Sequence, residues 1–126
     1  MSWDIPARSF PSPTDLTDAN RTETAMTDRI DASINEAAPP ADMAPALQAL
    51  WWLRKGGFAN GPAWERAHEI CQASEGVKEF DWIHALAHWI EGDTSNAAYW
   101  YRRAGEAQVG ADPAAEWDHI AARLSA

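Results

Sequence analysis

The chain has 126 residues, enough for one domain, with a net charge of -9 and a pI near 4.7. This acidity disfavours nucleic acid and anionic membranes as partners, because both carry negative charge. The one cysteine, Cys71, excludes a disulfide within the chain. No secretion signal or apolar run of about 18 residues is present, so we expect a cytoplasmic protein with no membrane span.

Residues 1–40 are predicted to form an N-terminal arm that contains one helix. The first twenty residues are rich in proline and show no periodicity. Asn20 followed by Glu23 is typical of a helix start. Apolar residues then recur at helical spacing until Pro39–Pro40. We therefore expect a helix at 21–37.

Residues 41–126 are predicted to form an all-α domain. No segment alternates with a period of two for long enough to make a strand. The predicted helices share apolar positions at helical spacing and lie at 42–55, 62–75, 79–91, 95–109 and 113–125. They pair into hairpins 42–75 and 79–109, and 113–125 is a capping helix. With the helix of the arm, the sequence predicts about five to six helices.

The segment 79–91 is the most apolar of these helices. Its apolar side chains fill roughly 220° of the helical wheel. Only a narrow polar stripe remains, formed by Asp81, His84, His88 and Glu91. So wide an apolar face needs neighbours on at least two sides, and we expect this helix at the centre of the domain.

Two features repeat between the predicted hairpins. Trp51 and Trp82 lie 31 residues apart in the first helices, and Ala67 and Ala97 lie 30 residues apart in the second. The segment 81–107, DWIHALAHWIEGDTSNAAYWYRRAGEA, resembles a tetratricopeptide motif, and its second half resembles a Sel1-type repeat. The block H-x3-H…EGD…NAxYWYRRAG also resembles a group of microbial proteins of no established activity. The resemblance implies antiparallel helical hairpins of the α-α superhelix type.

His84 and His88 are the main candidates for a binding site. They share one helix face at i, i+4, and Glu91 continues the stripe, so these side chains could reach one divalent ion. His68, on the preceding helix, could approach them. The alternative, which the sequence favours, is a structural stripe that hydrogen-bonds across the helix interface. HALAH lacks the glutamate of a zinc-protease helix, and we expect no metal or other cofactor.

Arg102 and Arg103 form a second candidate site on the outer face of helix 95–109. They could bind an acidic partner or a phosphate group. The plainer interpretation is a solvated face on which Arg103 pairs with Glu106 or Tyr99.

Trp52 is a third candidate, because it points about 100° away from Trp51 on the same helix. It must therefore meet the N-terminal arm, a second subunit or a ligand, since a fully exposed tryptophan is unusual. Cys71 lies on an apolar face, and there we expect an inert thiol.

Three functions fit these residues. The first is an interaction module whose hairpins bind a protein partner or a second copy of the chain in a homodimer. The second is a small metal-binding protein or enzyme that uses His84, His88 and Glu91. The third is a small-molecule sensor with a pocket walled by Trp82, Trp89 and Tyr101. No catalytic set is recognisable, which favours the first function and a non-enzymatic role.

Overall fold

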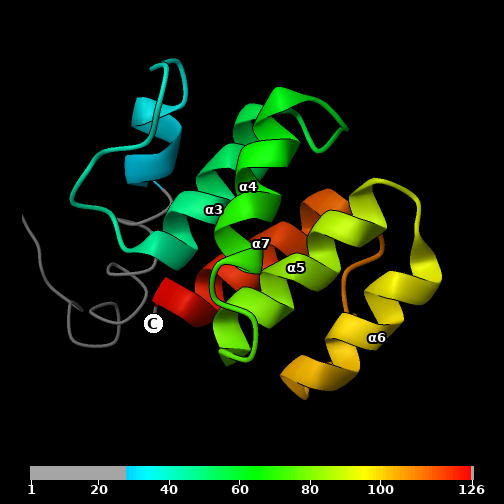
Figure 1. Cartoon of the computed structure of the whole chain (residues 1–126). Helices are drawn as coiled ribbons and strands as arrows, with labels where there is room; N and C mark the ends of the chain where they lie inside the picture. The colour runs from blue at the N-terminus through cyan, green and yellow to red at the C-terminus, as the bar shows by residue number, and fades with distance from the viewer. Residues whose placement is uncertain (1–27, 126) are drawn as a thin grey trace, which may run out of the picture.

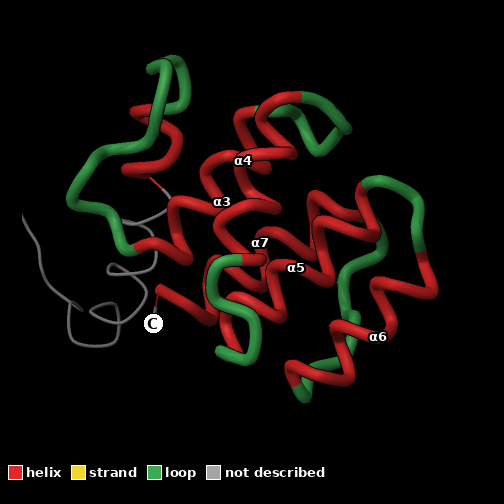
Figure 2. Tube along the Cα trace, in the orientation of Figure 1, coloured by secondary structure: helices red, strands yellow, loops and turns green. Residues whose placement is uncertain are grey.

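The computed structural model describes residues 28–125, and the regular structure in that range is helical, without strands (Figures 1 and 2). Residues 28–33 are helical, and five further helices follow: α3 (Pro45–Lys55), α4 (Pro62–Gln72), α5 (Lys78–Ile90), α6 (Thr94–Ala104) and α7 (Pro113–Ser125). The predicted all-α fold of five to six helices is confirmed. Within the described range, no helix has the length and apolarity needed to cross a membrane.

Proline sets the start of three helices. Pro62 and Pro113 begin α4 and α7, where the missing N–H costs nothing because first-turn N–H groups have no partner within a helix. The predicted start of the first body helix at residue 42 is wrong, because α3 begins at Pro45. The proline ring keeps Ala44 extended, with φ -58° and ψ 143°, so a helix cannot run through it.

Three helices end several residues earlier than predicted, and the first of them, α4, ends at Gln72 rather than at residue 75. Helix α6 stops at Ala104 rather than at residue 109, because Gly105 adopts a left-handed conformation with φ 71°. In the arm, the helix ends at residue 33 rather than 37. The Ser33 hydroxyl lies 3.3 Å from the Ile30 carbonyl, which a continued helix would need as acceptor for the Ile34 N–H, and that N–H bonds to the Asp31 carbonyl at 3.4 Å instead. The predicted start of this helix, at 21–27, lies outside the described residues.

The described part of the arm packs against α3. Ile30 is 1% exposed and belongs to the main core. The Trp51 indole N–H donates to the Ser33 hydroxyl at 2.9 Å, and the Lys55 ammonium donates to the Ile34 carbonyl at 2.8 Å. The arm therefore contributes a buried residue and two anchored contacts to the body.

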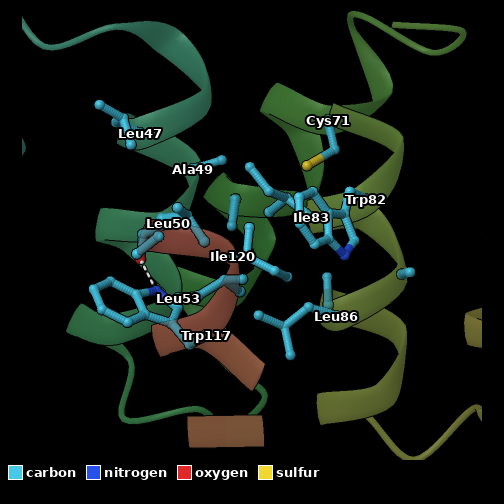
Figure 3. Packing of buried hydrophobic residues seen from close by; sticks show 14 of the residues in the cluster. Leu47, Ala49, Leu50, Leu53, Cys71, Trp82, Ile83, Leu86, Trp117 and Ile120 are labelled. Carbon is cyan, nitrogen blue, oxygen red and sulfur yellow. Dashed lines mark hydrogen bonds between the residues drawn. The ribbon is translucent and has the colours of Figure 1, made fainter. Parts of the chain in front are cut away.

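Helix α5 is the central element, as its wide apolar face predicts. Each of its residues from Asp81 to His88 is buried, and it contacts α3, α4, α6 and α7. Figure 3 shows side chains of four helices meeting in one core: Leu47, Ala49, Leu50 and Leu53 of α3, Cys71 of α4, Trp82, Ile83 and Leu86 of α5, and Trp117 and Ile120 of α7.

Two buried tryptophans tie helices together by hydrogen bonds as well as by area. The Trp64 indole on α4 donates to the Ala87 carbonyl on α5 at 2.7 Å. The Trp117 indole on α7 donates to the Leu50 carbonyl on α3 at 2.8 Å (Figure 3). A buried tryptophan removes about 150–250 Å² from water, roughly 4–6 kcal/mol of transfer free energy at 25 cal/mol per Å². The added hydrogen bonds fix how the helices align.

Candidate functional site

Three histidines meet at the interface between α4 and α5. His68 comes from α4, whereas His84 and His88 come from successive turns of α5. The Nε2 atoms of His68 and His84 lie 3.1 Å apart, a hydrogen bond across the interface. One ring nitrogen from each of the three residues lies within 4.8 Å of the other two. We call these residues the histidine cluster. The polar stripe of α5 thus makes a hydrogen bond across the helix interface, as expected for a structural stripe. It also brings together three side chains that can bind a metal ion.

Two tryptophans hold the imidazole rings in place. The His68 ring stacks on Trp64, with centroids 4.8 Å apart and an interplanar angle of 11°. The His84 ring stacks on Trp100 of α6 at 4.0 Å and 18°. Trp64 is itself fixed by its hydrogen bond to α5, so the histidine cluster rests on core residues of three helices. Such packing pre-organises the nitrogen atoms.

Burial favours the neutral form of two members of the histidine cluster, His68 and His84. His84 is 2% exposed and His88 is 7% exposed, whereas His68 is half-buried. Desolvation, followed by the neighbouring His88 and His68, lowers the pKa of His84 to about 3. Desolvation is also the largest cause that lowers the pKa of His68. At neutral pH both rings therefore carry an unprotonated nitrogen, the form that binds metal ions.

A carboxylate orients the third histidine. Glu91 follows the last residue of α5, and its Oε2 lies 2.5 Å from Nδ1 of His88. Nδ1 is thereby the donor, and Nε2 of a neutral His88 ring is left without a proton. Asp93 lies close to this pair, where it caps α6 by accepting from the Asn96 amide at 3.2 Å. Metal-binding histidines commonly have such a carboxylate partner.

The two candidate arginines lie on α6 outside the histidine cluster. Both are exposed, and Arg103 donates to the Tyr99 hydroxyl at 3.1 Å. Its guanidinium also lies 5.1 Å from the centre of the Trp100 ring. Arg103 thus pairs with Tyr99, one of the two partners expected on a solvated face. Among residues 28–125, neither arginine forms a hydrogen bond with a residue of the histidine cluster.

Trp52 also lies apart from the histidine cluster. It is half-buried and meets the edge of Trp51, with centroids 5.0 Å apart. The Arg66 guanidinium of α4 lies 5.6 Å from its ring centre. Part of the cover that the sequence requires for Trp52 therefore comes from its own hairpin.

One buried acid escaped the sequence analysis. Glu116 is fully buried in the first turn of α7, where it accepts from the Tyr101 hydroxyl at 2.7 Å. It also accepts from the backbone N–H groups of Val109 and Gly110 at 3.0 and 2.6 Å. A signal was present, because Glu116 precedes Ile120 by four residues and so shares its buried face. These contacts give Glu116 a structural role in joining α6, its following loop and α7.

A surface hollow of about 520 Å³ lies in the described part of the arm, away from the histidine cluster. It is lined by Arg29, Ala32, Ser33, Glu36, Ala38, Pro39 and Pro40. It contains none of the candidate site residues. Two of its polar side chains are already engaged, because Arg29 pairs with Asp42 at 2.9 Å and the Ser33 hydroxyl bonds to the Arg29 carbonyl and the Trp51 indole. The chemistry of the described residues is therefore concentrated at the histidine cluster and not in this hollow.

Comparison with protein families, with characterised proteins and with solved structures gives no match for this chain.

Proposed function

We propose that this chain binds a first-row transition-metal ion such as Zn²⁺ through His68, His84 and His88. The observation that carries the proposal is the convergence of three ring nitrogens within 4.8 Å of one another. Around a tetrahedral ion with metal–nitrogen bonds of about 2.0–2.1 Å, two ligand nitrogens lie about 3.3–3.4 Å apart. The His68–His84 separation of 3.1 Å is within a few tenths of an ångström of that spacing.

The chemistry of the three residues supports this reading. Neutral imidazole suits zinc, copper, nickel and iron, whereas calcium and magnesium prefer oxygen ligands. The lowered pKa values of His68 and His84 mean that an ion at neutral pH need not displace a proton from either ring. The carboxylate of Glu91 is in the place of a partner that orients a ligand histidine.

One buried nitrogen atom opposes metal binding, because leaving it without a hydrogen-bond partner costs free energy. Nδ1 of His84 is buried without a hydrogen-bond partner among the described residues. When Nε2 binds an ion, Nδ1 must carry the proton and becomes an unpaired donor, which costs about 1–3 kcal/mol. Binding with a micromolar Kd contributes about 8 kcal/mol. The penalty weakens the site without abolishing it.

Zinc titration of the chelator-treated full chain tests the proposal. We expect one ion per chain by calorimetry, with a Kd on the order of 1 μM, and a rise in thermal midpoint of several degrees at about 100-fold excess over Kd. His68→Gln should weaken binding at least tenfold. His68 is suitable because it is only half-buried, and so the variant should fold.

His119→Gln is the matched control. His119 is the remaining histidine of the chain and packs against Trp82, with ring centres 5.7 Å apart. Its replacement should leave zinc affinity unchanged. Equal losses in the two variants would indicate nonspecific binding. Absence of stoichiometric binding to the unaltered chain would leave the structural, hydrogen-bonded stripe as the whole role of these histidines.

An interaction module is a second proposal, supported by Trp52. This side chain stays half-buried although it belongs to a core helix. Ala67 and Ala97 are buried, as close-packing alanines of a tetratricopeptide-like repeat would be. Deletion of residues 1–20 should change the oligomeric state or the exposed hydrophobic surface, measured by light scattering and dye binding. If neither changes, a module covered by its own arm is refuted.

A further inference from the structure

We infer that an ion held by the histidine cluster keeps one coordination position for an exchangeable small ligand, either water or a monovalent anion. This inference rests on the proposed metal binding and adds what the bound ion would do. Structural zinc sites are closed by four protein ligands, whereas reactive ones have three and an open position. The histidine cluster offers three histidines, and no further His, Cys, Asp or Glu of residues 28–125 converges with all of them.

Glu91 is the nearest acid that could close the site, and its geometry argues against that role. Its Oε2 is bound to Nδ1 of His88. The two nitrogens of an imidazole ring face in different directions, so a carboxylate held at Nδ1 points away from an ion on Nε2. Glu91 is therefore a positioning residue, which orients the His88 ring.

Asp93 is also committed elsewhere. Its Oδ1 caps α6 by accepting from the Asn96 amide at 3.2 Å, and its Oδ2 accepts from the Asn96 side chain at 3.2 Å. A move to the ion would break both contacts at the start of that helix. The two acids beside His88 are thus occupied by its imidazole ring and by the start of α6.

Access to the fourth position is restricted to one side. Trp64 and Trp100 cover the ring faces of His68 and His84. Among the histidine cluster and its partner Glu91, the half-buried residues are His68 and Glu91, so these two border solvent. An exchanging ligand must enter past them, and the nearly complete burial of His84 favours a small one.

Three neutral nitrogen ligands leave the full double charge of the ion uncompensated. The ion would then polarise a bound water strongly, as three-histidine zinc sites lower the pKa of water toward about 7. Loss of one proton from that water gives a metal-bound hydroxide and releases the proton to solvent. A small monovalent anion would compete for the same position, because it neutralises the same charge.

Cobalt(II) replaces zinc in the experiment, because its visible spectrum reports the number and type of ligands. Co²⁺ is added to the chelator-treated full chain, and azide is then titrated at constant pH. We expect a saturable, reversible shift of the visible bands with azide. A similar shift should appear between about pH 6 and 9 as bound water ionises. His119→Gln should behave as the unaltered chain does.

Glu91→Gln separates the positioning role from ligation. We expect a 10–100-fold loss of Co²⁺ affinity with the azide response retained, because the ligand set is unchanged. A variant spectrum of a different coordination class would make Glu91 a ligand and overturn the inference. Bound Co²⁺ whose spectrum ignores both azide and pH would also overturn it and leave metal binding intact. Failure of Co²⁺ and Zn²⁺ to bind at all would instead refute the proposed function.

Discussion

Removal of the Glu116 carboxylate should destabilise the fold by about 3–5 kcal/mol. Its Oε1 accepts from the Val109 and Gly110 amides, and its Oε2 accepts from the Tyr101 hydroxyl. A hydrogen bond to a charged group contributes about 1.5–3 kcal/mol, so three independent bonds would sum to about 4.5–9 kcal/mol. The true loss is smaller, because the bonds share one group and alanine removes the desolvation penalty of the buried charge.

Urea unfolding followed by tryptophan fluorescence measures this loss in Glu116→Ala. Glu116→Gln is the matched control, because its amide oxygen can still accept from the two backbone N–H groups, and it should lose only about 1–2 kcal/mol. Tyr101→Phe removes one bond and should lose about 1 kcal/mol. The reasoning is refuted if the unfolding free energy of Glu116→Ala lies within about 1 kcal/mol of that of the unaltered chain. It is also refuted if Tyr101→Phe lowers the unfolding free energy as much as Glu116→Ala does.

Three further predictions concern the histidines and their surroundings. The pKa of His84 is about 3 in the folded chain against an ordinary 6.5, so the unfolded chain binds the proton first. Stability without metal should therefore fall by up to about 1.4 kcal/mol per pH unit as pH drops from 6.5 toward 3, and a flat profile in urea unfolding would contradict this. Burial raises the pKa of the Cys71 thiol, which should therefore react with a disulfide reagent only after unfolding. Rapid reaction of this thiol in the folded chain would contradict the prediction. Trp64→Phe removes the hydrogen bond to the Ala87 carbonyl and should lower the free energy of unfolding by about 1–3 kcal/mol. Trp89→Phe, at a half-buried side chain, should lower it less. A larger loss of thermal stability in Trp89→Phe than in Trp64→Phe would contradict this prediction.

Helix number and the central place of α5 follow from local patterns, which explains why the sequence predicts them. Apolar spacing and a first-turn proline act within one helix and need no tertiary information, as at Pro62 and Pro113. The errors have equally local causes. Pro45 favours a helix start and Gly105 favours a helix end, and α3 and α6 follow these residues. Both residues carry signals that outweigh continued apolar spacing.

The candidate site is only partly local, and so it is only partly predictable. The spacing of His84 and His88 on one helix places them together in any helical fold. Their contact with His68 depends on how α4 aligns with α5, which periodicity does not contain. The alignment follows from tertiary packing, including the Trp64 bond to the α5 backbone. The spacing of Glu116 and Ile120 indicates a shared buried face, but periodicity does not place the backbone donors of Glu116, which lie in the loop before α7.

The histidine cluster and the fold depend on the same interface. Two of its members belong to α5, so only His68 must be held in place by packing between helices. Trp64 supplies much of that packing, since it bonds to α5 and stacks on His68 at once. An ion that joins His68 to α5 would therefore resist separation of α4 from α5, and it would stabilise the folded chain by an amount that grows with its concentration over Kd. Metal affinity and unfolding free energy then report on one structural element, the alignment of α4 with α5.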